Sequence, residues 1–121
     1  MDNLLTKDID VIVQRAAEKA REYKSADLKT HQLRTFYGSI SRMRNQTLGM
    51  SEGKYLKVKH DVTMLKPKLA YAAGRNSKNV KGFSDDMIRV VEQVKDDITL
   101  ENFFALVESV VAYHKYYGGG E

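Results

Sequence analysis

The sequence contains no cysteine, no tryptophan and a single proline in 121 residues. Without cysteine, the chain can form neither a disulfide framework nor a thiolate zinc site, and it has no cysteine nucleophile. Its nearly uncharged run at 103–107 stops at Glu108, far short of the ~20 apolar residues that a membrane span needs. The first residues lack the basic start and apolar stretch of a secretory signal. We therefore expect a cytoplasmic protein that does not interact with membranes.

The length predicts one domain. A chain of 121 residues falls in the usual size range of single domains, and folding buries about two-thirds of the surface that the unfolded chain exposes. That is enough for one hydrophobic core without covalent cross-links. We expect a single helical domain over residues 1–121.

The net charge of +4 is unevenly distributed along the chain. Residues 1–24 carry five basic and five acidic side chains, residues 25–82 carry twelve and three, and residues 83–121 carry three and eight. A basic middle segment is typical of proteins that contact phosphate groups. A solvated lysine-rich surface has the same composition, so charge alone leaves both interpretations open.

Apolar residues recur at three- and four-residue spacing nearly throughout the chain, which predicts an all-α fold. We expect a compact bundle of about five helices, with a long and central C-terminal helix because that segment is the most apolar. Thr30 and Ser84 are the expected N-caps of the second and fourth helices, and Gly118 should end the last helix in a left-handed conformation. The expected helices span about residues 8–23, 31–47, 54–74, 85–95 and 99–117.

Pro67 falls inside the third expected helix. At 100° per residue, Val58, Leu65 and Leu69 remain on one face on both sides of it, which favours one kinked helix with Pro67 on the solvent side. The alternative is a break at which Pro67 starts a new helix. Residues 76–82 are rich in turn-forming and basic residues, so we expect a loop there.

No arrangement of side chains in the sequence predicts catalysis. His31, His60 and His114 lie on three different elements without a partner at ligand spacing, so we expect no metal and no cofactor. His114 lies on the apolar side of the last helix, where a hydrogen-bonded core histidine is more common than a catalytic one. Residues 49–54 are not a phosphate loop, because only three residues separate the glycines and Tyr55 follows the lysine. We therefore do not expect an enzyme.

Basic side chains gather on particular faces of two expected helices. Arg34 and Arg42 share a face beside the core stripe of the second helix. On the third helix, Lys68 and Arg75 lie within about 20° of each other by wheel angle, and Lys66 marks the opposite flank of the core stripe. The basic residues of the middle segment are therefore expected to cluster on particular helix faces, which their number alone does not indicate.

Between these flanks, the third expected helix presents a partly apolar strip that faces away from the core. The strip could contact a neighbouring subunit, a nucleobase or a ribose. It could equally be covered by the rest of the chain. The members of this strip are Leu56, His60, Met64, Pro67 and Tyr71.

Three blocks of the sequence together resemble the small helical subunit of the Csm effector complex, the interference complex of type III-A CRISPR-Cas. The resemblance covers about residues 28–117, and its middle block is the most specific. Residues before 28 and residues 48–54 show no such signal. The blocks are 30–37 (THQLRTFY), 65–75 (LKPKLAYAAGR), and 103–104 (FF) with 108–115 (ESVVAYHK).

This resemblance implies a non-catalytic subunit in antiviral defence. Members of the family stack in several copies beside the backbone subunits, which hold the guide RNA. They contact the guide RNA–target RNA duplex, chiefly through the target strand, and dock on the large signalling subunit and on neighbouring copies of themselves. The resemblance assigns target RNA cleavage to the backbone subunits, and DNA cleavage and cyclic oligoadenylate synthesis to the large one.

Four basic residues in the matching blocks are the RNA contacts that the resemblance implies: Arg34, Lys66, Lys68 and Arg75. Charge geometry adds three more: Arg42, Lys78 and Lys81. Lys115 lies in the last block and could also reach RNA, although Glu108 shares its side of the helix and could pair with it. A protein that binds any duplex should contact phosphates and riboses rather than base edges.

Two other classes of function are compatible with parts of the sequence. A helical DNA-binding regulator would place one helix in a major groove, but no helix-turn-helix with a short, tight turn is recognisable. A small enzyme with an unusual site would depend on His60 or His114.

Overall fold

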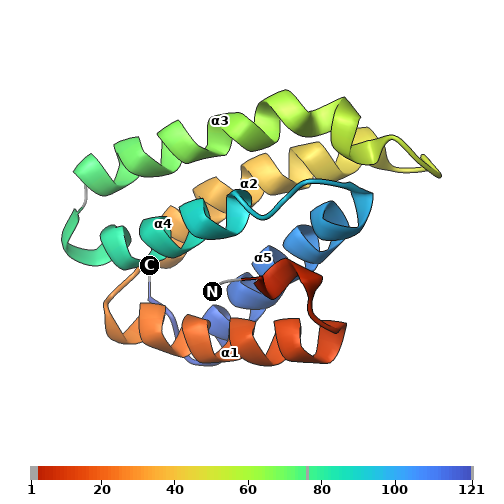
Figure 1. Cartoon of the computed structure of the whole chain (residues 1–121). Helices are drawn as coiled ribbons and strands as arrows, with labels where there is room; N and C mark the ends of the chain where they lie inside the picture. The colour runs from red at the N-terminus through yellow and green to blue at the C-terminus, as the bar shows by residue number, and fades with distance from the viewer. Residues whose placement is uncertain (1–2, 76, 121) are drawn as a thin grey trace.

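The chain folds into an all-α bundle, which confirms the fold class expected from the periodicity. The computed structural model describes residues 3–75 and 77–120, and no strand occurs within them. Figure 1 shows the five α-helices and one short 3-10 helix. In chain order they are η1 (Leu4–Thr6), α1 (Ile9–Ser25), α2 (Thr30–Thr47), α3 (Lys54–Arg75), α4 (Ser77–Val91) and α5 (Asp97–Tyr116).

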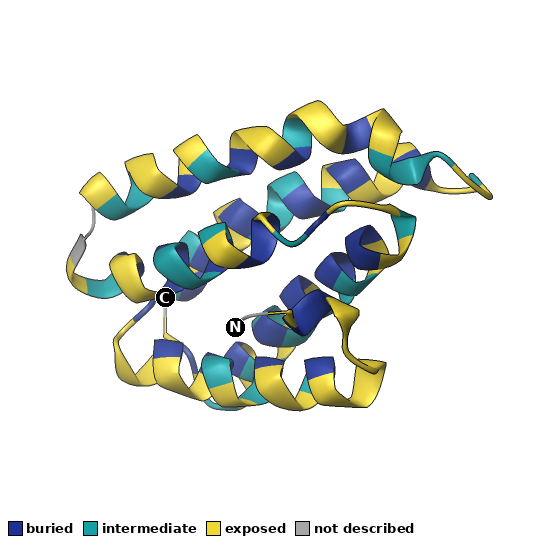
Figure 2. Cartoon of the chain, in the orientation of Figure 1, coloured by how far each residue is buried: buried dark blue, intermediate teal, exposed yellow. Residues whose placement is uncertain are grey.

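The helices pack mainly as two pairs, α1 with α5 and α3 with α4, and α2 contacts both α5 and α3. Figure 2 shows the buried residues on the inner sides of the helices, while the outer edge of α3 is mainly exposed. The core is largely aliphatic, and Phe36, Phe83 and Tyr23 add edge-to-face aromatic contacts to it.

Helix α5 is the central helix, as its apolar sequence predicts. Its buried side chains include Leu100, Phe103, Leu106 and Val110. It begins at Asp97, because the Asp96 carboxylate caps it by accepting the backbone N–H of Thr99 at 2.8 Å. This hydrogen bond, and a second one from the Thr99 hydroxyl, lower the pKa of Asp96 below its usual value.

Helix α3 runs without interruption from Lys54 to Arg75, with Pro67 inside it. Continuity of the helix is confirmed, and the alternative of a break at Pro67 is wrong. Pro67 is exposed, on the side where the missing backbone N–H costs least. The buried stripe continues on both sides of it, from Val58 to Leu69.

Helix α4 begins at Ser77, so the prediction of a loop over residues 76–82 and of Ser84 as an N-cap is wrong. Asn76 itself lies outside the described residues. Gly82 has a low helix propensity, yet Val80 and Phe83 are buried in the core on the same helical stripe as Met87. Burial of that stripe outweighs the local preference for a turn.

Helix α2 starts one residue earlier than expected, with Lys29 as its N-cap and Thr30 as its first residue. The backbone N–H of Lys29 donates to the side chain of Gln32 at 2.9 Å. The hydroxyl of Thr30 instead donates to the carbonyl of Gly119 at 3.2 Å. The expected cap is therefore used in a contact between distant parts of the chain.

The short helix η1 had no counterpart in the sequence prediction. Leu4 and Leu5 are buried, and the backbone of Leu5 bonds at both polar groups. Its N–H donates to the side-chain oxygen of Gln93 at 2.9 Å, and its carbonyl accepts from the amide of Asn102 at 2.8 Å.

The residues after α5 fold back over the end of the bundle. Gly118 has φ +87°, which confirms the expected left-handed cap. The N–H of Gly119 donates to the carbonyl of His114 at 2.9 Å, and the carbonyl of Gly120 accepts from the N–H of Thr30 at 2.6 Å. This segment, residues 118–120, is called the tail below.

His114 lies beneath the tail and is only 1% exposed. Its Nε2 is 2.8 Å from the carbonyl oxygen of Leu28, so the expectation of a hydrogen-bonded core histidine is confirmed. A Cβ atom at position 119 would collide with the His114 imidazole. Only glycine can let the tail pass so close to the ring.

Candidate nucleic-acid interface

The eight candidate RNA contacts lie on four helices, and all are exposed except the half-buried Lys66. Helices α2 and α4 carry two each, α3 carries three and α5 carries one. They are Arg34 and Arg42 on α2, Lys66, Lys68 and Arg75 on α3, Lys78 and Lys81 on α4, and Lys115 on α5.

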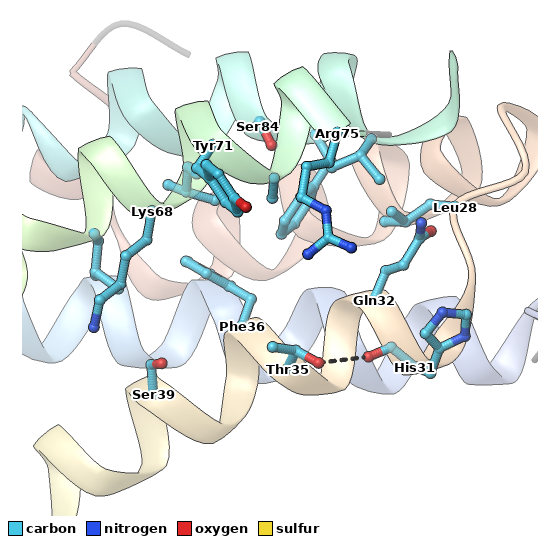
Figure 3. A pocket seen from close by; sticks show the side chains of 15 residues that line it. Leu28, His31, Gln32, Thr35, Phe36, Ser39, Lys68, Tyr71, Arg75 and Ser84 are labelled. Carbon is cyan, nitrogen blue, oxygen red and sulfur yellow. Dashed lines mark hydrogen bonds between the residues drawn. The ribbon is translucent and has the colours of Figure 1, made fainter. Parts of the chain in front are cut away.

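A groove of about 560 Å³ lies where the first half of α2 faces the second half of α3, with α4 beneath. We call it the α2–α3 groove (Figure 3). Its inner lining is apolar and belongs to the buried core. Those apolar residues include Phe36, Leu65, Leu69, Val80 and Phe83.

Two of the candidate cations, Lys68 and Arg75, line the α2–α3 groove from the α3 side (Figure 3). The guanidinium of Arg75 lies 5.8 Å from the centre of the Tyr71 ring, in a cation–π contact. Arg42 adjoins the groove, because it donates to the hydroxyl of Ser39 at 3.2 Å and Ser39 is a lining residue. The structure thus brings three of the eight candidates to one feature.

The α2 side of the groove is polar, and the sequence prediction did not include it. Gln32, Thr35 and Ser39 line the groove together with His31. The hydroxyl of Thr35 donates to the backbone carbonyl of His31 at 3.0 Å. Their three- and four-residue spacing is a signal that the sequence did contain, because it places these polar side chains on one face of a helix.

The other candidates lie outside the lining of the groove, and some have acidic neighbours. Lys81 pairs with Asp85 at 3.3 Å, and Lys66 lies 3.9 Å from Glu92. Arg34, Lys78 and Lys115 are exposed and do not line the groove.

The suggested pairing of Lys115 with Glu108 is replaced by another contact. The carboxylate of Glu108 lies 3.0 Å from the guanidinium of Arg44, which reaches it from α2. Both of these side chains are about half exposed, so the pair contributes little to stability.

No acidic residue is among the fifteen that line the α2–α3 groove. Elsewhere in the described chain many basic groups have carboxylate partners. Lys19, for example, lies within 3.4 Å of Glu22 and 3.2 Å of Asp86. Cations that have no nearby carboxylate keep their full attraction for an external anion.

Asp86, on α4, is the centre of a partly buried polar cluster and does not line the groove. Besides Lys19, it accepts a hydrogen bond from the hydroxyl of Tyr23 at 2.7 Å and contacts Arg89 at 3.3 Å. Burial, and then the hydrogen bond to Asp86, raise the pKa of Tyr23 far above its usual value. This cluster joins α1 to α4.

Comparison with known proteins shows the family of this chain. The family model described as Csm2 type III-A matches residues 6–120. The chain belongs to the Csm2 family. A Streptococcus thermophilus protein named "CRISPR system Cms protein Csm2" is 31% identical over 94 residues, which cover 76% of this chain and 74% of that protein. No solved structure gives a significant match.

Membership in the Csm2 family makes the chain a small subunit of a type III-A CRISPR-Cas complex. The match includes α1, for which the sequence blocks alone showed no family signal. Csm2 is a family of structural subunits. Within the part of the chain that the structure describes, no cluster of three or more histidine or acidic side chains could hold a metal ion.

The partly apolar strip on α3 of this Csm2-family chain, called the α3 strip below, is exposed. Leu56 is 76% exposed, Tyr71 is 67% exposed, and His60, Met64 and Pro67 are also exposed. The alternative in which the rest of the chain covers the strip is therefore wrong. In residues 3–75 and 77–120, no helix is long and apolar enough to cross a membrane.

Proposed function

We propose that this chain is a non-catalytic subunit that binds the guide RNA–target RNA duplex through its sugar–phosphate backbone, with several copies stacked along the duplex. The observation that carries the proposal is the cationic edge of the α2–α3 groove. Lys68 and Arg75 line it, Arg42 adjoins it, and none of the lining residues that the structure describes is acidic. Such a site attracts phosphate oxygens and repels little of an incoming polyanion.

The chemistry of this edge suits binding without sequence preference. An A-form duplex hides its major-groove base edges and presents phosphates and 2′-hydroxyl groups. Arginine and lysine bind phosphates, while the hydroxyl and amide groups of Thr35, Ser39 and Gln32 on the α2 side suit riboses. A subunit that must accept every guide sequence needs this type of contact.

Stacking of copies draws on two exposed surfaces. The α3 strip is partly apolar and has Lys57 and Lys59 beside it in sequence on α3. Residues 83–121, by contrast, carry eight acidic and three basic side chains. A head-to-tail arrangement can place the acidic surface of one copy against the basic surface of the next. Repetition along one duplex then turns weak individual contacts into useful affinity.

The test is charge reversal of Arg34, Lys68 and Arg75 to glutamate in the assembled complex, with target RNA affinity measured over a salt series. Each lost phosphate contact should reduce the slope of log affinity against log salt by about one unit. We expect a weaker affinity and a shallower slope for the triple variant.

A matched control changes three exposed lysines away from the α2–α3 groove to glutamate: Lys7, Lys24 and Lys95. Its net charge equals that of the first triple variant. We expect this control to change affinity far less. Equal behaviour of the two triple variants would contradict the proposal. Sequence-specific binding of duplex DNA by the isolated chain would favour the DNA-binding regulator instead.

A further inference from the structure

The interior of the α2–α3 groove is an apolar surface. The proposed contacts between the cations at its edge and the RNA sugar–phosphate backbone leave this surface unoccupied. Phe36, Leu69 and Phe83 line it, and each is at least nine-tenths buried. Phe36 and Phe83 meet edge to face with ring centroids 5.4 Å apart. The volume of about 560 Å³ lies within the range of small-molecule sites, about 300–1,000 Å³.

Ser84 gives this interior an unusual polar atom. The residue is 0% exposed, it lines the groove from α4, and its Oγ has no hydrogen-bond partner among the described residues. In the view of Figure 3 the Ser84 side chain, on α4, lies between the labelled side chains of Tyr71 and Arg75. Among the described side chains of α4, it is the one polar group in the lining, beside Val80 and Phe83. Buried hydroxyl groups without partners are rare in folded proteins, and a ligand atom is one explanation for them.

The lining defines the chemical class of a ligand. An apolar aromatic interior favours a flat hydrophobic body, and Lys68 and Arg75 at the edge favour a negative charge attached to it. The exposed ring of Tyr71, with Arg75 over it, adds a stacking surface at the opening. A nucleotide combines these properties, since a planar base is joined to a phosphate.

We propose that the α2–α3 groove binds one unpaired nucleotide, with its base against Phe36 and Ser84 and its phosphate between Lys68 and Arg75. An unpaired residue of the bound RNA and a free mononucleotide share this chemistry, and the RNA source rests on the function proposed above. A hydroxyl both donates and accepts hydrogen bonds. Ser84 therefore suits the edge of any base, in agreement with binding that ignores sequence.

The first experiment uses the full chain and the fluorescent nucleotide 2-aminopurine riboside 5′-monophosphate. We expect saturable quenching as the base enters the groove. Ribose 5-phosphate, which lacks the base, should compete at least tenfold less well than adenosine 5′-monophosphate, because stacking of a base contributes that much affinity. Equal competition by the two compounds would show that only the phosphate binds, and would overturn the inference.

Two variants locate the site. Ala72→Leu fills the groove from α3 while keeping every cation, and should weaken nucleotide binding at least tenfold. Its matched control is Ala70→Leu, an exposed position on the same helix that does not line the groove. Ser84→Ala removes the hydroxyl with little change of volume and should weaken binding about fivefold. Unchanged binding in both Ala72→Leu and Ser84→Ala would place the nucleotide elsewhere.

The second experiment separates this inference from the proposed function. An RNA duplex with one unpaired 2-aminopurine residue should bind about tenfold more tightly than the same duplex with an abasic residue there, and Ala72→Leu should abolish the difference. If neither duplex binds, the mononucleotide titration decides the inference by itself, and the charge-reversal test in the assembled complex decides the proposed function. If both duplexes bind equally and the mononucleotide does not bind, the inference is wrong and the proposed function stands.

Discussion

The α2–α3 groove contains a lysine and a buried serine hydroxyl that have no partner among the described residues, whereas a buried histidine and a lysine on the α1–α5 side of the bundle are both paired. On the first side His114 bonds the Leu28 carbonyl, and Lys19 contacts two carboxylates. Along the groove, Lys68 forms no ion pair with a described residue, and Ser84 lacks a partner although it is buried. Unpaired buried groups cost stability, and proteins keep them mainly at sites where another molecule uses them. The contrast separates the part of the molecule that maintains the fold from the part that we expect to bind.

The largest expected effect concerns the contact between the tail and His114, on the α1–α5 side of the bundle. Gly119→Ala places a Cβ against the His114 ring, so the tail must move and its bonds to Thr30 are lost. We expect the free energy of unfolding in urea to fall by about 3 kcal/mol. Gly120→Ala is the control, because a Cβ there meets no atom within 4 Å, and it should change stability by less than about 0.5 kcal/mol. Similar effects of both changes would mean that the tail does not pack on His114.

A pair of lysine substitutions compares the two sides directly. Lys19→Gln removes contacts with Glu22 and Asp86 at a side chain that is 19% exposed, and should lower the free energy of unfolding by about 1 kcal/mol. Lys68→Gln removes a cation that makes no ion pair in the described chain, and should leave stability within about 0.5 kcal/mol of the original. Thermal and urea unfolding measure both. A greater cost for Lys68→Gln would contradict the assignment of Lys68 to binding.

Removal of a buried hydroxyl should have opposite effects at two positions. Ser84→Ala deletes a hydroxyl without a partner, so the free energy of unfolding should stay constant or rise by up to about 1 kcal/mol. Thr99→Ala deletes a hydroxyl that bonds Asp96 at 2.8 Å, and should lower stability. A clear loss of stability on Ser84→Ala would show that this hydroxyl is satisfied in solution.

The smallest effect concerns pH at the start of α5. The pKa of Asp96 is lowered in the folded chain by hydrogen bonds from Thr99. A lowered folded pKa contributes stability above the unfolded value, near 3.8, and this contribution is lost as the pH falls through the folded pKa. Asp96→Asn keeps a capping oxygen but cannot titrate, so its urea midpoint should fall less steeply on acidification below about pH 4. Parallel pH profiles for the two proteins would contradict this role of the carboxylate.

Most of the fold could be predicted from the sequence, because four of the five helices carry long apolar stripes with clear helical spacing. The prediction failed at α4, where local composition and tertiary packing disagree. Asn79 and Gly82 indicate a turn, whereas Val80 and Phe83 gain enough from burial to continue the helix. For the same reason Ser84 was predicted to be an N-cap, whereas it lies within α4 and lines the groove.

The candidate site was predicted less completely than the fold. Lys68 and Arg75 could be chosen from their shared helix face, but a groove also needs the opposite wall. That wall comes from α2, whose Thr35 and Ser39 reach α3 only through long-range packing. Periodicity within one helix carries no information about which other helix lies opposite. Whether any of the eight candidate cations binds RNA stays a prediction.

The central position of α5 has a consequence for biosynthesis. Residues 97–116 form the middle of the core, yet the ribosome makes them after all the other helices. The inner faces of α1 and α2 lack their main partner until α5 has left the exit tunnel. Translation adds about 5–20 residues per second. The apolar surfaces of the earlier helices therefore stay exposed for several seconds before α5 is available. The bundle must therefore complete its folding after most of its chain has been synthesised.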